Sequence, residues 1–137
     1  MPVDYQWDNN DKTIMRYTVQ GAWDWNDFYR QMRRSLLWWD DLDHVVDIII
    51  DFRGGDHLPD GSIKLPAGAM AHLRSIGTIE HANAPHRAVV IGVSADLQAK
   101  IGAVDGVYKP PRREIRFVEN DDQARAVIAD WRRGSIP

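Results

Sequence analysis

The 137-residue sequence contains no cysteine. The chain therefore has no thiol for a disulfide, a cysteine nucleophile, an iron–sulfur cluster or the usual structural zinc site. The lack of cysteine leaves the redox compartment open, and we expect a reducing cytoplasm as the simpler interpretation.

Long apolar runs are missing as well. The longest, Ala88–Val93, is six residues and is too short to cross a bilayer. Asp4 and Asp8 interrupt the N-terminal region with charge, unlike a secretory signal. We therefore expect no membrane partner.

Excess positive charge is absent too, since the formal net charge is −3. The basic segment Lys109–Arg116 has only Tyr108 beside it as an aromatic, so stacking on bases has little support. We expect a solvated surface there and no nucleic-acid partner.

What the sequence does contain is the composition of a globular domain, with 44% hydrophobic and 27% charged residues. A chain of this length buries roughly two-thirds of its unfolded surface. We predict a single domain spanning residues 1–137.

Periodicity divides the chain into alternating strands and helices. A polar turn separates two alternating segments, which predicts an N-terminal hairpin, and a β-branched run predicts a central strand covered on both faces. The expected strands are Val3–Trp7, Ile14–Val19, Val45–Phe52, Ala88–Val93 and Ile115–Val118. The expected helices follow Asp24, run from Ala67 to about His81, follow Ser94 as far as Ile101, and follow Asn120.

The helix after Asp24 carries the clearest apolar stripe in the chain. Six residues share one side at helical spacing, namely Trp25, Phe28, Tyr29, Met32, Leu36 and Trp39. Trp38 lies out of phase beside Leu37, which indicates either a partner surface or a side chain folded under the linker Asp40–His44. These alternatives have equal support.

Strands separated by helices require right-handed parallel crossovers. The predicted fold class is therefore α/β, with a mixed sheet of about five strands in which an N-terminal hairpin precedes parallel crossovers packed against helices.

This order of elements, with the segment Val46–Phe52 ending a hydrophobic strand in Asp51, resembles the STAS-like (SpoIIAA-like) superfamily. That fold occurs in bacterial anti-sigma-factor antagonists and in related lipid-carrier domains. The resemblance implies a regulatory protein-interaction module, whose phosphorylated serine has its nearest counterpart in Ser62. Here Ser62 is displaced by a loop that contains Gly54 and Gly55.

The best candidate binding segment leaves the end of the predicted central strand, where ligands of open α/β sheets commonly lie. It offers five candidate ligand-binding residues: Asp51, Arg53, Asp56, His57 and Ser62. The plainer interpretation is that Asp51 caps loop amides and pairs with Arg53, while the other acidic residues form turns.

Recognisable catalytic motifs are absent. The five histidines include no His-x-x-x-His pair, and no Gly-x-Ser-x-Gly surrounds a serine. We predict no catalytic residues, no metal ligands and no cofactor, and the question of enzyme activity stays open with a leaning against it.

The sequence therefore leaves two candidate functions. The first is a non-enzymatic STAS-like module for protein interaction or regulation that forms a homodimer near Leu37 and Trp38. The alternative is a small-molecule or lipid-like ligand-binding protein, or an enzyme, with a pocket formed by the Arg53–Pro66 loop and aromatics such as Trp23, Trp25 and Phe28.

Overall fold

The computed structural model describes residues 2–77, 79–94, 97 and 115–134. Its elements are β1 (Val3–Trp7), β2 (Ile14–Val19), α1 (Trp25–Trp39), β3 (Asp47–Asp51), α2 (Ala69–Gly77), β4 (Ala88–Ile91), β5 (Ile115–Val118) and α4 (Asp121–Arg132). The expected helix after Ser94 falls mostly outside the described residues. Of the basic segment Lys109–Arg116, the part 109–114 lies outside them as well. The amide of Leu97 does donate to the Ser94 hydroxyl, as a cap would require.

The five strands form one sheet in sequential order, β1-β2-β3-β4-β5. β1 and β2 are antiparallel, with Tyr5 opposite Tyr17, and every later pair is parallel. The predicted α/β class and mixed sheet are therefore confirmed, whereas the STAS-like assignment stays a prediction.

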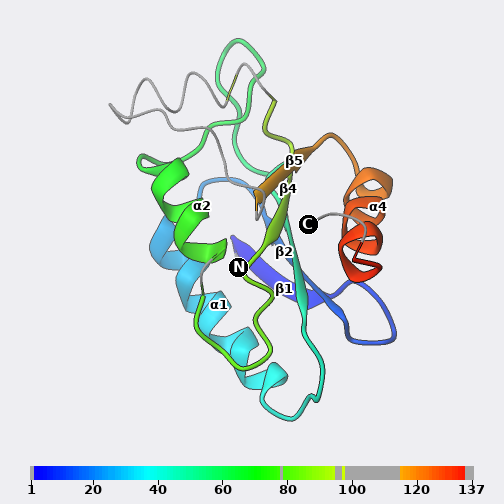
Figure 1. Cartoon of the computed structure of the whole chain (residues 1–137). Helices are drawn as coiled ribbons and strands as arrows, with labels where there is room; N and C mark the ends of the chain where they lie inside the picture. Colours follow the sequence, from blue (N-terminus) through cyan, green and yellow to red (C-terminus); the bar gives the residue numbers. More distant parts are fainter. Residues whose placement is uncertain (1, 78, 95–96, 98–114, 135–137) are drawn as a thin grey trace.

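Helices cover both faces of the sheet (Figure 1). The β2–α1–β3 and β3–α2–β4 crossovers advance in the same direction, so right-handed connections place α1 and α2 on one face. α4 follows the last strand, belongs to no crossover, and packs on the opposite face.

The α1 and α2 face holds the larger core. Met15, Tyr17 and Val19 point to this face, as their alternation in β2 predicts, and all three are buried. β3 lies in the middle of the sheet and all five of its residues are buried, so the prediction of a doubly covered central strand is confirmed.

Local signals start both long helices. The Asp24 side chain accepts from the amide of Asp27, whose carboxylate accepts from the Asp24 amide, completing a capping box. At α4 the Asn120 side chain caps Gln123, but the Gln123 side chain bonds the amide of Glu119 instead of the cap residue.

Three elements have boundaries that differ from expectation. β3 begins at Asp47 and ends at Asp51, one residue before Phe52, and Val45 is exposed and does not pair in the sheet. β4 ends at Ile91 instead of Val93, just before Gly92 with its positive φ. α2 begins at Ala69, after Gly68 with a positive φ of 79°, and ends at Gly77 well before His81. Glycine at each end limits the helix to the part that buries Leu73 and Ile76.

Candidate functional site

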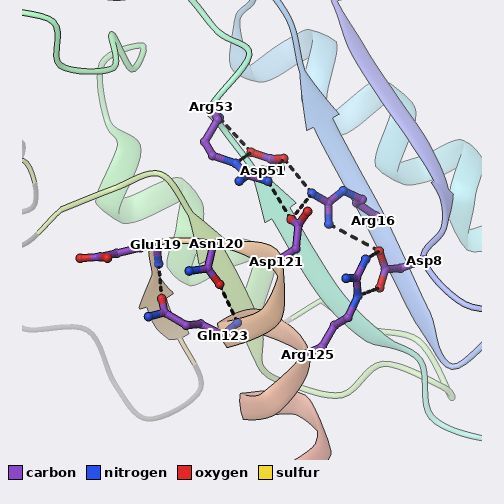
Figure 2. Close-up of polar contacts among 9 residues, drawn as sticks. All are labelled: Asp8, Arg16, Asp51, Arg53, Glu119, Asn120, Asp121, Gln123 and Arg125. Carbon is purple, nitrogen blue, oxygen red and sulfur yellow. Dashed lines mark hydrogen bonds and ion pairs between the residues drawn. The ribbon is translucent and has the colours of Figure 1, made fainter.

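Arginine and aspartate side chains form a cluster where β2 and β3 meet the start of α4 (Figure 2). Nη2 of Arg16, from β2, donates to the carboxylates of Asp51 at 2.8 Å and Asp121 at 2.7 Å. Arg53 donates to Asp51 through its backbone amide, Nε and Nη2, and Nη2 also reaches Asp121 at 2.7 Å. The cluster joins residues that are up to 105 positions apart in sequence.

Asp8 extends this cluster beyond β1. Its carboxylate accepts two hydrogen bonds from Arg125 of α4, at 3.0 and 3.1 Å, and lies 3.5 Å from Nη1 of Arg16. The six side chains comprise three arginines and three aspartates, so the cluster is neutral as a whole. It links α4 to β2 and to the end of β3.

The arginines favour the ionised form of two of these carboxylates, those of Asp51 and Asp121. Burial opposes ionisation of Asp51, but hydrogen bonds from Arg53 and the charges of Arg53 and Arg16 outweigh it and lower its pKa. A hydrogen bond from Arg16 is the main cause that lowers the pKa of Asp121. Because both acids are held in the charged form and paired, neither is suited to donate or accept a proton near neutral pH.

A cavity of about 420 Å³ opens beside Arg53, at the carboxyl ends of β3, β4 and β5. Its apolar wall comes from Ile63, Val93, Phe117 and Val118, and its polar groups come from Arg53, His57, Ser94 and Glu119. Gly92, with a φ of 102°, lines it too, and a Cβ there would lie 2.8 Å from Cδ1 of Ile63. The predicted place for a pocket therefore does contain a cavity.

Two of the five candidate ligand-binding residues line this cavity, and the other three do not. Asp51 is 7% exposed and caps the Arg53 amide, as the plainer interpretation expected. Arg53 and His57 line the cavity, whereas exposed Asp56 borders a separate cavity of about 70 Å³. Ser62 donates to the Asp60 carboxylate in a turn and lines neither cavity.

The Arg53–Pro66 segment is more regular than the expected loop. Lys64 bonds the Asp56 carbonyl, His57 pairs with Ile63, and Leu58 bonds the Ser62 carbonyl, which together form a short antiparallel ladder. The base of the ladder depends on Gly54, where a Cβ would lie 2.7 Å from the Val19 carbonyl oxygen. The glycine pair therefore serves close backbone approach.

The aromatics expected to form the pocket pack mainly against one another, although Trp23 also borders the smaller cavity of about 70 Å³. Trp23 stacks on Phe52 at 5.4 Å, and Trp25 and Phe28 are buried in the core. Trp25 donates to the carbonyls of Pro66 and Ala67 and so holds the end of the loop. Phe117 of β5 supplies the aromatic surface of the larger cavity.

The out-of-phase Trp38 packs on the edge strand of the sheet. Its ring meets Tyr5 edge-on at 4.7 Å and stacks with Trp7 at 6.3 Å, yet 47% of the residue stays exposed. Neighbouring Leu37 is 68% exposed. We name these four residues, Tyr5, Trp7, Leu37 and Trp38, the β1–α1 patch.

Sequence reasoning missed most of the ionic residues. Alternation in Ile14–Val19 places Arg16 on the less apolar face of a strand, and the structure shows this strand to be internal. Asp47 is fully buried beneath Arg87, at 2.6 and 3.1 Å, and Arg132, at 2.9 Å. A charged residue within an otherwise apolar strand was the available signal, and its arginine partners are distant in sequence.

Comparisons with protein-family models and with curated proteins find no match. Among the described residues, no three histidines, aspartates or glutamates are placed to hold a metal ion. No helix within the described ranges has the length and apolarity needed to span a membrane.

Proposed function

We propose that this protein is a non-enzymatic, STAS-like interaction domain that associates with a second copy of itself through the β1–α1 patch. One observation carries the proposal. Leu37 and Trp38 expose apolar surface that is continuous with the rings of Tyr5 and Trp7. Surface tryptophans with such neighbours are characteristic of protein interfaces.

The sequential α/β sheet supports the STAS-like part of this proposal, because it has the order of elements that the resemblance implies. The ionic cluster supports binding over catalysis. Asp51, the most central candidate acid, is paired with Arg16 and Arg53, while His57 is exposed on the loop.

Light scattering of the full chain over a range of concentrations tests self-association. We expect a dimer whose dissociation constant rises about 30-fold in Trp38→Ser, since truncating a central interface tryptophan costs about 2 kcal/mol. Leu58→Ser is the matched control, because Leu58 is 41% exposed on the distant loop. A wild-type protein that stays monomeric at high concentration contradicts the proposal.

The cavity favours a second candidate function, the binding of a small ligand with an apolar body and a polar group. Phe117 and Val93 would contact the apolar part, while Arg53 and Ser94 offer hydrogen bonds. A fluorescent naphthalene sulfonate serves as the probe. We expect saturable binding that Ser94→Phe abolishes by filling the cavity and that Ser62→Phe, outside it, preserves. Equal binding by both variants would count against this function.

A further inference from the structure

β1 presents an open hydrogen-bonding edge. It is the first strand of the sheet, and β2 is its only neighbour among the described strands. The Pro2 carbonyl accepts from Gln20 and the Asp8 amide donates to Ile14. Bonded pairs alternate along an antiparallel ladder, so Asp4 and Gln6 bond with β2. The backbone groups of Val3, Tyr5 and Trp7 therefore point away from the sheet.

Two of these three residues, Tyr5 and Trp7, belong to the β1–α1 patch. Val3, Tyr5 and Trp7 alternate onto the face that α1 covers, where Val3 is buried and Trp38 packs on the other two. The open edge and the exposed apolar surface are thus contiguous. A strand added at this edge would extend the sheet and cover the patch together.

We propose that the occupant is β1 of a second copy, paired antiparallel about a two-fold axis that passes midway between the two Tyr5 residues. This inference rests on the proposed function and gives the dimer a register: Tyr5 lies opposite Tyr5 of the second copy, and Val3 lies opposite Trp7. All three outward-facing residues then form bonded pairs, with about six hydrogen bonds between the copies. A shift of two residues leaves some of these groups unpaired in a five-residue strand.

Charges on α1 and just after its C-terminal end match this two-fold arrangement. α1 connects the parallel strands β2 and β3, so it runs opposite to β2 and in the direction of β1. The axis between the two Tyr5 residues therefore sets the two α1 helices antiparallel. Exposed Arg34 lies about one turn before the patch and exposed Asp41 about one turn after it. Each arginine then faces the aspartate of the other copy, which favours a second copy as the occupant.

The opposite face of β1 makes the register measurable. Asp4 and Gln6 are exposed there, and in the proposed register Asp4 lies opposite Gln6 of the second copy. Such a non-bonded pair has its Cα atoms about 4.5 Å apart, within reach of a disulfide. Two copies of the same residue are farther apart than about 7 Å, beyond that reach. Because the chain has no cysteine, introduced thiols have no competitors.

The experiment oxidises the full-length variants Asp4→Cys and Gln6→Cys with copper phenanthroline, separately and mixed. We expect a cross-linked dimer in the mixture and little in either variant alone. Self-cross-linking of one variant, or none in a mixture that light scattering shows to be dimeric, overturns the register and leaves the proposed self-association standing. A monomeric wild type overturns both.

Charge reversal at two exposed positions, one on α1 and one just after it, gives an independent readout. Arg34→Asp and Asp41→Arg should each weaken the dimer several-fold, and the double variant should regain wild-type association. A double variant as weak as the single variants contradicts the antiparallel placement of the two helices.

Discussion

The two faces of the sheet are covered in different ways. Under α1 and α2 the core consists of large apolar side chains, including Tyr17, Phe28 and Trp39. Under α4 a smaller apolar cluster around Ile49 lies between two groups of Arg–Asp pairs, one at Asp47 and one at Asp51. Burial of apolar area stabilises the first face, and this effect does not depend on the orientation of individual contacts. The stability of the second face depends on the pairing and geometry of charged side chains.

This difference indicates which interactions make the fold specific to its sequence. Burial of apolar area tolerates changes of shape that preserve volume. Buried ion pairs tolerate few substitutions, because a buried ion without its partner costs several kcal/mol. Asp47 and Asp51 flank Ile49 on one strand. Arg132 of α4 pairs with Asp47, and Asp121 of α4 shares Arg53 with Asp51, so both ends of α4 are tied to β3.

Truncation on the α1 face should have the largest effect. Phe28 is fully buried and its ring lies 5.4 Å from that of Tyr17. We expect Phe28→Ala to lower the free energy of unfolding by about 3–5 kcal/mol in urea titrations, through lost burial and a cavity. Met32→Leu is the volume-conserving control and should cost less than about 1.5 kcal/mol. A loss near zero for Phe28→Ala would mean that this face is not the main core.

Breaking one ion pair on the α4 face should cost less. Asp51→Asn leaves Arg16 and Arg53 with Asp121 as a remaining partner, so we expect a loss of about 2–3 kcal/mol at neutral pH. Gln6→Asn, on an exposed side chain of β1, serves as a control with little expected change. An unchanged unfolding midpoint for Asp51→Asn would show that the cluster does not stabilise the protein.

Low pH should weaken the Arg–Asp pairs of the α4 face and leave the apolar α1 face unaffected. The folded pKa of Asp51 lies below its ordinary value of 3.8, so its stabilising effect is complete above that value and is lost as pH falls through the folded pKa. Asp121 has the same sign. We expect the wild type to lose stability below about pH 4 and Asp51→Asn to lose less over the same range. Parallel acid profiles for the two proteins would contradict this assignment.

The fold could be predicted from the sequence because its signals are local. The bounds of β1, β2 and β5, the cap at Asp24 and the buried run Ile48–Ile50 follow from alternation, capping and β-branching over a few residues. The prediction of the buried face of α1 was less accurate. Gln31 and Ser35 are buried as well, and Ser35 shares a hydrogen bond of 2.5 Å with the Tyr17 hydroxyl.

The site was harder to predict because its contacts are long-range. Asp51 and Arg53 are neighbours in sequence, but their pairing with Arg16 and Asp121 exists only once β2, β3 and the start of α4 meet. The ring of Trp38 likewise packs against Tyr5, which is distant in the sequence. Periodicity identifies an anomalous residue, but it does not identify the neighbour that explains it.

A smaller effect is expected where the two faces meet at the carboxyl edge of the sheet. Gly92 has a φ of 102°, and a Cβ would lie 2.8 Å from Ile63 and 3.2 Å from Cγ of Arg53. We expect Gly92→Ala to cost about 1–3 kcal/mol in thermal or urea unfolding, from backbone strain and crowding. Gly61→Ala, also at positive φ but with open space around it, isolates the backbone contribution. Equal losses would show that contact with Ile63 and Arg53 is unimportant.

The smallest effect concerns the helix ends, where the two faces should behave alike. Asn120 caps α4 through the Gln123 amide at 2.9 Å, as Asp24 caps α1 through the Asp27 amide at 2.8 Å. We expect Asn120→Ala and Asp24→Ala each to cost about 1 kcal/mol in urea unfolding, with Asn120→Asp nearly neutral. Because Asp121 follows the Asn120 cap directly, a loss well above that of Asp24→Ala would mean that the α4 cap and the Arg–Asp cluster act as one cooperative unit. Equal losses would confine the difference between the faces to the side chains that cover the sheet.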